Sequence, residues 1–145
     1  MDFHPFFVHF PISLFLFALL LELIHYKINW IHPNVPLFIF VFASILSIPT
    51  AFTGNSAEFD AGKINGIFLL LESHESAGTL VTISGILFSI LLIFFKLKFP
   101  TKSLSIMRKS IFLLMSIMVL YTGYLGGEMV HEFGAGTKII LELKN

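Results

Sequence analysis

Histidine is the side chain in this sequence best suited to hold a metal or a cofactor, because the chain contains no cysteine. The absence of cysteine excludes disulfides, thiolate metal sites, cysteine-bound iron–sulfur clusters and the covalent attachment of c-type haem. Four of the six histidines fall toward the same end of the apolar segments of the chain. They are His4, His9, His74 and His131.

These histidines are predicted to lie at comparable depths on different helices. Counted from the lysines at the other end at about 1.5 Å per residue, His74 and His131 lie about 33 Å along their helices and His9 about 27 Å. Helical bundles build ligand sites from facing side chains at one depth. Imidazoles are axial ligands of haem iron, so two of them on different helices could hold a b-type haem.

A small residue lies one helical turn inward from three of these histidines. Residues four apart share a face of a helix, so each imidazole would have a shallow groove on its membrane side. A flat macrocycle bound by histidine needs that clearance. Small residues at this spacing also allow membrane helices to pack closely without any ligand. The residues are Ser13 after His9, Gly78 after His74, Gly127 before His131, and Gly123, which continues the last stripe.

The pattern leaves three functional hypotheses. In the first, one or two b-type haems carry electrons, with His9 and His74 as the primary axial pair and His4 and His131 as a second pair or supporting ligands. In the second, three or four of the same histidines bind copper, zinc or iron without a macrocycle. In the third, the protein is a structural or assembly subunit with interfacial histidines. The sequence has no hydrolase or nucleotide-binding motif, which favours an electron carrier over an enzyme.

Four apolar stretches are long enough to place these residues in a membrane. A helix needs about 20 residues, with about 17 as the lower limit, to cross a hydrocarbon core of about 30 Å. We therefore predict a single all-α domain over residues 1–145, an up-down-up-down bundle of four transmembrane helices. The first stretch lacks the basic start of a signal peptide and is predicted to be retained. The predicted spans are Pro5–Tyr26, Pro36–Thr53, Ala77–Phe95 and Ile111–Val130.

The composition agrees with a membrane protein. Apolar residues make up 56% of the chain and charged residues 12%, whereas about a quarter of a soluble domain is charged. The net charge is zero and no basic cluster alternates with aromatic residues, so nucleic acid is not an expected partner. The expected partners are the lipid bilayer, a periplasmic c-type cytochrome or a quinone, and a second copy of the chain.

The basic residues predict the orientation. Most of the nine lysines and arginines flank the first and third connections, the third being predicted over Lys96–Ser110. The positive-inside rule places these connections in the cytoplasm. Both termini and the four histidines then face the periplasm from a bacterial inner membrane. The flanking residues are Lys27, Lys96, Lys98, Lys102, Arg108 and Lys109.

The predicted cytoplasmic half offers fewer candidates. His25 and His32 have no histidine partner on the other segments, so any redox centre is expected near the outer face. Glu22 lies close to His25 and Tyr26. We interpret Glu22 either as part of a site for a proton or a quinone head group, or as a residue that reaches the lipid head groups.

The opening His4-Pro-Phe-Phe-Val-His-Phe-Pro-Ile-Ser-Leu14 resembles that of an uncharacterised family of small bacterial four-helix membrane proteins, which typically begin HP-x-x-VHFPIAL. Thr53-Gly54, the histidine ahead of the third span and the closing Gly126-Gly127 are similar to the same family. Relatives occur alongside c-type cytochrome domains, which implies electron transfer at the outer face. The family more usually has an aromatic residue at position 131, so the resemblance supports the other three histidines more than His131.

Overall fold

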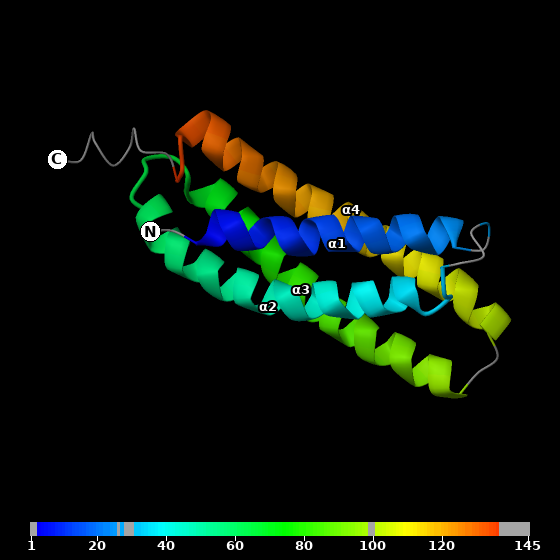
Figure 1. Ribbon diagram of the computed structural model, residues 1–145. Helices are drawn as coiled ribbons and strands as arrows, with labels where there is room; N and C mark the ends of the chain where they lie inside the picture. The colour runs from blue at the N-terminus through cyan, green and yellow to red at the C-terminus, as the bar shows by residue number, and fades with distance from the viewer. Residues whose placement is uncertain (1–2, 26, 28–30, 99–100, 137–145) are drawn as a thin grey trace.

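Four long helices follow one another in the part of the chain that the structure describes. The computed structural model describes residues 3–25, 27, 31–98 and 101–136 (Figure 1). The helices are α1 His4–Ile24, α2 Val35–Ala61, α3 Phe68–Lys98 and α4 Thr101–Phe133. Each is long and apolar enough to cross a membrane. This confirms the predicted all-α fold of four spanning helices.

The helices form a closed ring. α1 packs on α2, α2 on α3, α3 on α4 and α4 on α1. Consequently α1 and α3 face each other across one diagonal, and α2 and α4 across the other. Consecutive helices run in opposite directions, so α1 begins and α4 ends at the same end of the bundle (Figure 1). We name this the histidine end, and the opposite end, where α1 ends and α4 begins, the basic end.

Aromatic side chains fill the centre of the ring. Phe40 of α2 and Phe112 of α4 stack across the diagonal with ring centroids 4.4 Å apart and planes at 4°. Phe15 of α1 meets Phe40 edge-on at 5.1 Å. All three rings are fully buried, while many large apolar side chains on the outside are exposed. Helices that are apolar on all sides suit a bundle surrounded by lipid.

Two buried serine hydroxyls form hydrogen bonds inside the bundle. The Ser44 hydroxyl donates to the Phe40 carbonyl at 2.9 Å and accepts a hydrogen bond from Ser89 of α3 at 3.0 Å. Gly85 of α3 lies against the same serine, and an added Cβ there would come within 3.1 Å of the Ser44 oxygen. Small residues thus bring α2 and α3 close together, as in other membrane bundles.

The helices extend beyond the predicted spans. α3 begins at Phe68 rather than Ala77, which places His74 inside the helix. α4 begins at Thr101, so most of the connection predicted over Lys96–Ser110 is helical. The reason is that hydropathy detects only the part of a helix that lies in hydrocarbon, about 30 Å. The 31 residues of α3 rise by about 46 Å at 1.5 Å per residue, so its polar ends continue as helix beyond the core.

Candidate metal centre at the histidine end

His4 and His74 lie side by side at the histidine end. His4 stands in the first turn of α1, where the fixed φ of Pro5 favours the start of a helix. His74 comes from α3, on the opposite side of the ring. The ring centroids are 6.4 Å apart and the ring planes are at 86°. Two of the four predicted histidines are therefore brought together from diagonal helices.

Backbone carbonyls of the neighbouring helices orient both rings. His4 Nδ1 donates to the Thr50 carbonyl of α2 at 3.1 Å and contacts the Thr53 hydroxyl at 3.3 Å. His74 Nδ1 donates to the Thr122 carbonyl of α4 at 3.1 Å. A carbonyl only accepts, so Nδ1 carries the proton in each ring and the neutral imidazole has its lone pair on Nε2. Histidines that bind metals are commonly oriented by such a bond from the second ring nitrogen.

A glycine of the neighbouring helix lies against each ring. A Cβ added at Gly54 would come within 3.1 Å of His4 Cε1, and one added at Gly126 within 3.1 Å of His74 Cε1. The same contact thus occurs twice. The histidine of α1 packs on the Thr-x-x-x-Gly segment Thr50–Gly54 of α2, and the histidine of α3 packs on the Thr-x-x-x-Gly segment Thr122–Gly126 of α4. The repeated segment is visible in the sequence and is the signal that points to these contacts. Spacing within single helices did not reveal it.

The structure does not bring His9 and His131 to the pair. His9 is exposed, and its Nδ1 donates to the Pro5 carbonyl one turn earlier in the same helix. Ser13 donates in turn to the His9 carbonyl at 2.7 Å. The His131 side chain is 87% exposed and its Nδ1 lies 3.1 Å from a Glu132 carboxylate oxygen. The sequence suggests that His9 is the partner of His74, but the structure places His4 next to His74 instead.

The three predicted glycines do not make close contact with the imidazoles. An added Cβ at Gly78 would be 3.9 Å from the Thr122 methyl group, and one at Gly123 would be 3.7 Å from the Ile12 side chain. These two glycines therefore serve helix packing. Gly127 has no heavy atom within 4 Å of such a Cβ among the neighbours that the structure describes. A fixed spacing along a helix gives the depth of a residue but not the neighbour that it faces.

The distance between the centroids of the two rings is of the size that two imidazole ligands of one metal ion have. Metal–nitrogen bonds of about 2.0–2.1 Å on both sides would put two imidazole centroids roughly 6 Å apart, close to the observed 6.4 Å. Within the described ranges, no three His, Asp or Glu side chains are grouped to hold an ion. The predicted non-haem site of three or four histidines is thus not formed there, since His9 and His131 point elsewhere.

The cavity beside the His4 ring is smaller than a macrocycle needs. His4 lines a cavity of about 90 Å³ together with Thr50, Gly54, Gly78 and Thr122. Pockets for small organic ligands measure roughly 300–1,000 Å³. The two imidazoles are donors that suit haem iron, whereas this cavity, which His4 lines and His74 does not, is by itself too small for a porphyrin. A single ion without a macrocycle meets no such obstacle.

Comparison with known proteins places the chain in a family. The model of the family described as predicted membrane protein, DUF2231, matches residues 1–139. The chain belongs to the DUF2231 family. No curated protein and no solved structure matches it. The match agrees with the family of membrane proteins expected from the opening motif, and its description carries no activity.

A second polar site of this DUF2231 protein lies near the basic end. Glu22 of α1 is fully buried and forms an ion pair with Arg108 of α4, which is 7% exposed. His25 Nδ1 lies 3.9 Å from the same carboxylate oxygen. Glu22 therefore does not reach the lipid head groups, and Arg108 does not lie in a basic connection. A buried carboxylate requires a countercharge, and an arginine just before the fourth apolar run is the signal that could have identified it.

Proposed function

We propose that this DUF2231 protein is a membrane electron carrier whose redox centre is a metal held between His4 and His74. The observation that carries the proposal is the pairing of the two rings at 6.4 Å, with each Nδ1 bound to a backbone carbonyl. This arrangement fixes the tautomer of both rings and directs the remaining lone pairs to Nε2, the nitrogen that would bind the metal.

Haem b is the first form of this centre, because imidazoles from different helices are usual axial ligands of its iron. His4 and His74 would supply those ligands, and the haem would supply one-electron chemistry when bound. The small cavity favours a second form, a single copper ion, because imidazole suits copper and no macrocycle has to be accommodated. In both forms the protein would act as an electron carrier.

The proposal places the redox centre on the periplasmic side of a bacterial inner membrane. Lys27, Lys96, Lys98 and Lys109 belong to the basic end, whereas Lys63 follows α2 at the histidine end. Because lysine and arginine are enriched in cytoplasmic loops, the basic end would face the cytoplasm. A periplasmic c-type cytochrome is then the proposed electron partner, as the family resemblance implies.

The experiment is metal analysis of the purified full chain, with absorption spectra of the oxidised and dithionite-reduced states. We expect one bound metal ion per chain. A haem would give Soret and α bands, whereas a copper ion would be detected without them. H4A and H74A should lose the metal, while H9A and H131A, which remove the exposed histidines, should retain it. A wild-type chain without bound metal, or equal loss in all four variants, would overturn the proposal.

A further inference from the structure

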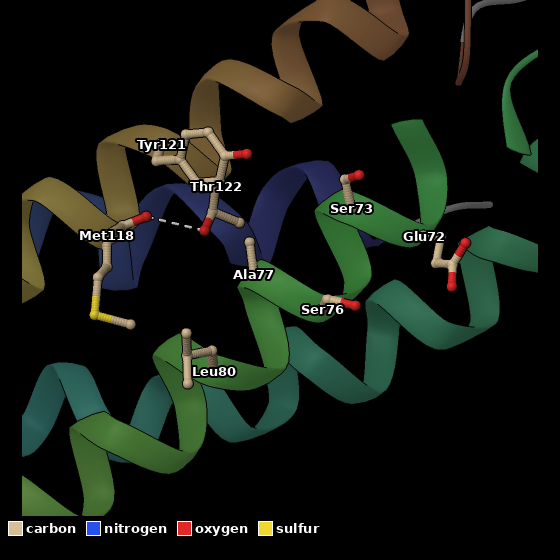
Figure 2. Close-up of a pocket in the computed structure, with 8 residues that line it drawn as sticks. All are labelled: Glu72, Ser73, Ser76, Ala77, Leu80, Met118, Tyr121 and Thr122. Carbon is tan, nitrogen blue, oxygen red and sulfur yellow. Dashed lines mark hydrogen bonds between the residues drawn. The ribbon is translucent and has the colours of Figure 1, made fainter. Parts of the chain in front are cut away.

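An open groove lies between α3 and α4 at the histidine end (Figure 2). Its volume is about 470 Å³, within the range of roughly 300–1,000 Å³ that is typical of small-molecule sites. Leu80 on one wall is 58% exposed and Tyr121 on the other is 55% exposed. Since both residues belong to spanning helices, the groove opens on the surface that faces lipid. A ligand would enter it from the bilayer.

The groove is polar toward the end of the bundle and apolar farther in. Glu72 and Ser76 of α3 supply a carboxylate and a hydroxyl, and Tyr121 of α4 supplies a phenol (Figure 2). Leu80 and Met118 form the deeper part. The phenol can donate a hydrogen bond and the carboxylate can accept one. The arrangement suits an amphiphile with a small head group that both accepts and donates hydrogen bonds.

At the matched positions of the other half of the chain, phenylalanines take the places of the small residues. When His4 is matched with His74, Phe6 corresponds to Ser76 and Phe7 to Ala77. The Phe6 and Phe7 rings contact each other edge-on with centroids 5.6 Å apart. The serine and the alanine therefore open the groove in the second half, where the repeat would otherwise place bulky aromatic side chains.

Thr122 connects the groove with the histidine pair. Its side chain lines the groove, with the hydroxyl donating to the Met118 carbonyl at 3.0 Å (Figure 2). Its own carbonyl accepts the hydrogen bond from His74 Nδ1 at 3.1 Å. Only the backbone of α3 and α4 would thus separate a ligand in the groove from the His74 ring. An electron would have a short path between the ligand and this ring.

We propose that the groove binds an isoprenoid quinone, with the quinone ring beside Tyr121 at the polar end and the start of the tail along Leu80 and Met118. The choice of a redox-active amphiphile rests on the proposed electron-carrier function. No lysine or arginine lines the described groove, and the Glu72 carboxylate repels phosphate. A neutral quinone therefore matches the groove better than an anionic phospholipid.

The experiment is photo-labelling of the full chain, reconstituted in phosphatidylcholine nanodiscs, with a short-tailed azido-benzoquinone. We expect saturable labelling of α3 and α4 residues around the groove, which an unlabelled benzoquinone with a ten-carbon tail competes away. S76F and A77F place the phenylalanines of the first half in the groove and should weaken labelling at least tenfold. Y121F removes a single hydrogen bond and should weaken it about three- to tenfold.

The matched control is L120F, which adds a phenylalanine to an exposed position of α4 outside the groove and should label as the wild type does. Uniform labelling of lipid-facing residues, or unchanged labelling of S76F and A77F, would overturn the quinone site. Competition by added phosphatidylglycerol as effective as that by quinone would identify a lipid groove instead. Labelling of H4A and H74A distinguishes the two proposals, because these variants should still bind the quinone even if no metal is found.

Discussion

The Glu22 carboxylate is fully buried, and the Arg108 guanidinium neutralises it from the neighbouring helix α4. Glu22 Oε1 and Arg108 Nε have no hydrogen-bond partner among the described residues, so the two side chains are joined through Glu22 Oε2 and Arg108 Nη2. In R108L the carboxylate would remain in the interior without a countercharge, and we expect the free energy of unfolding to fall by about 3–5 kcal/mol. SDS titration in mixed micelles, followed by far-ultraviolet circular dichroism, measures this change.

The double variant E22L/R108L separates the loss of charge from the loss of packing. Replacing both partners of a buried ion pair with apolar residues is often neutral or stabilising. We therefore expect the double variant to regain most of the stability that R108L loses. A double variant as unstable as R108L would contradict this explanation and assign the loss to packing of the arginine side chain.

The histidines show how far single residues can be predicted from the sequence. The absence of cysteine and the common depth of four histidines identify the residue type and the end of the bundle. The rotation of each helix about its axis is set by packing between helices, which a single sequence does not contain. For that reason the sequence predicts His9 as the partner of His74, whereas the structure places His4 there.

At the scale of the helices, the four spans follow from hydropathy because lipid requires long apolar segments. The helix ends do not follow, since backbone hydrogen bonds continue into polar sequence such as Glu72–Glu75. The contacts between helices likewise cannot be predicted from residue patterns within a single helix. The close approach of Gly126 to His74 depends on the packing of α3 against α4.

The close contact between Gly126 and the His74 ring can be tested by adding a side chain at position 126. G126L would force a side chain into the position where even a Cβ comes within 3.1 Å of His74 Cε1. We expect the ring to move and its bond to the Thr122 carbonyl to break, which ¹⁵N NMR of the imidazole detects. If the proposed metal binds, its affinity should fall about 10- to 100-fold, as is typical when an orienting bond is lost.

G127L is the matched control for this prediction. It makes the same substitution one residue later on the same helix, where a new Cβ meets no described neighbour within 4 Å. Both changes alter helix propensity equally. The His74 signals of G127L should therefore match those of the wild type, and a similar perturbation in both variants would show that contact with the ring is not the cause.

For the whole molecule, the arrangement of the helices in one ring puts the two polar sites at opposite ends. The histidine pair lies where α1 begins and the Glu22–Arg108 pair near where α1 ends. The stacked rings of Phe40 and Phe112 lie one helical turn from the ion pair toward the histidine end, because Phe112 follows Arg108 by four residues in α4. The orientation of the bundle in the membrane therefore decides which compartment the candidate metal centre faces.

The chain has no cysteine, so a single introduced cysteine reports the orientation without background. H131C lies at the histidine end and K98C at the basic end, both at exposed positions. If the lysines of the basic end face the cytoplasm, a membrane-impermeant maleimide should label H131C in cells with a permeabilised outer membrane. K98C should be labelled only after the inner membrane is also opened, and F112C, which is fully buried, in neither case. The reverse pattern would place His4 and His74 on the cytoplasmic side, where a periplasmic c-type cytochrome could not reach the site.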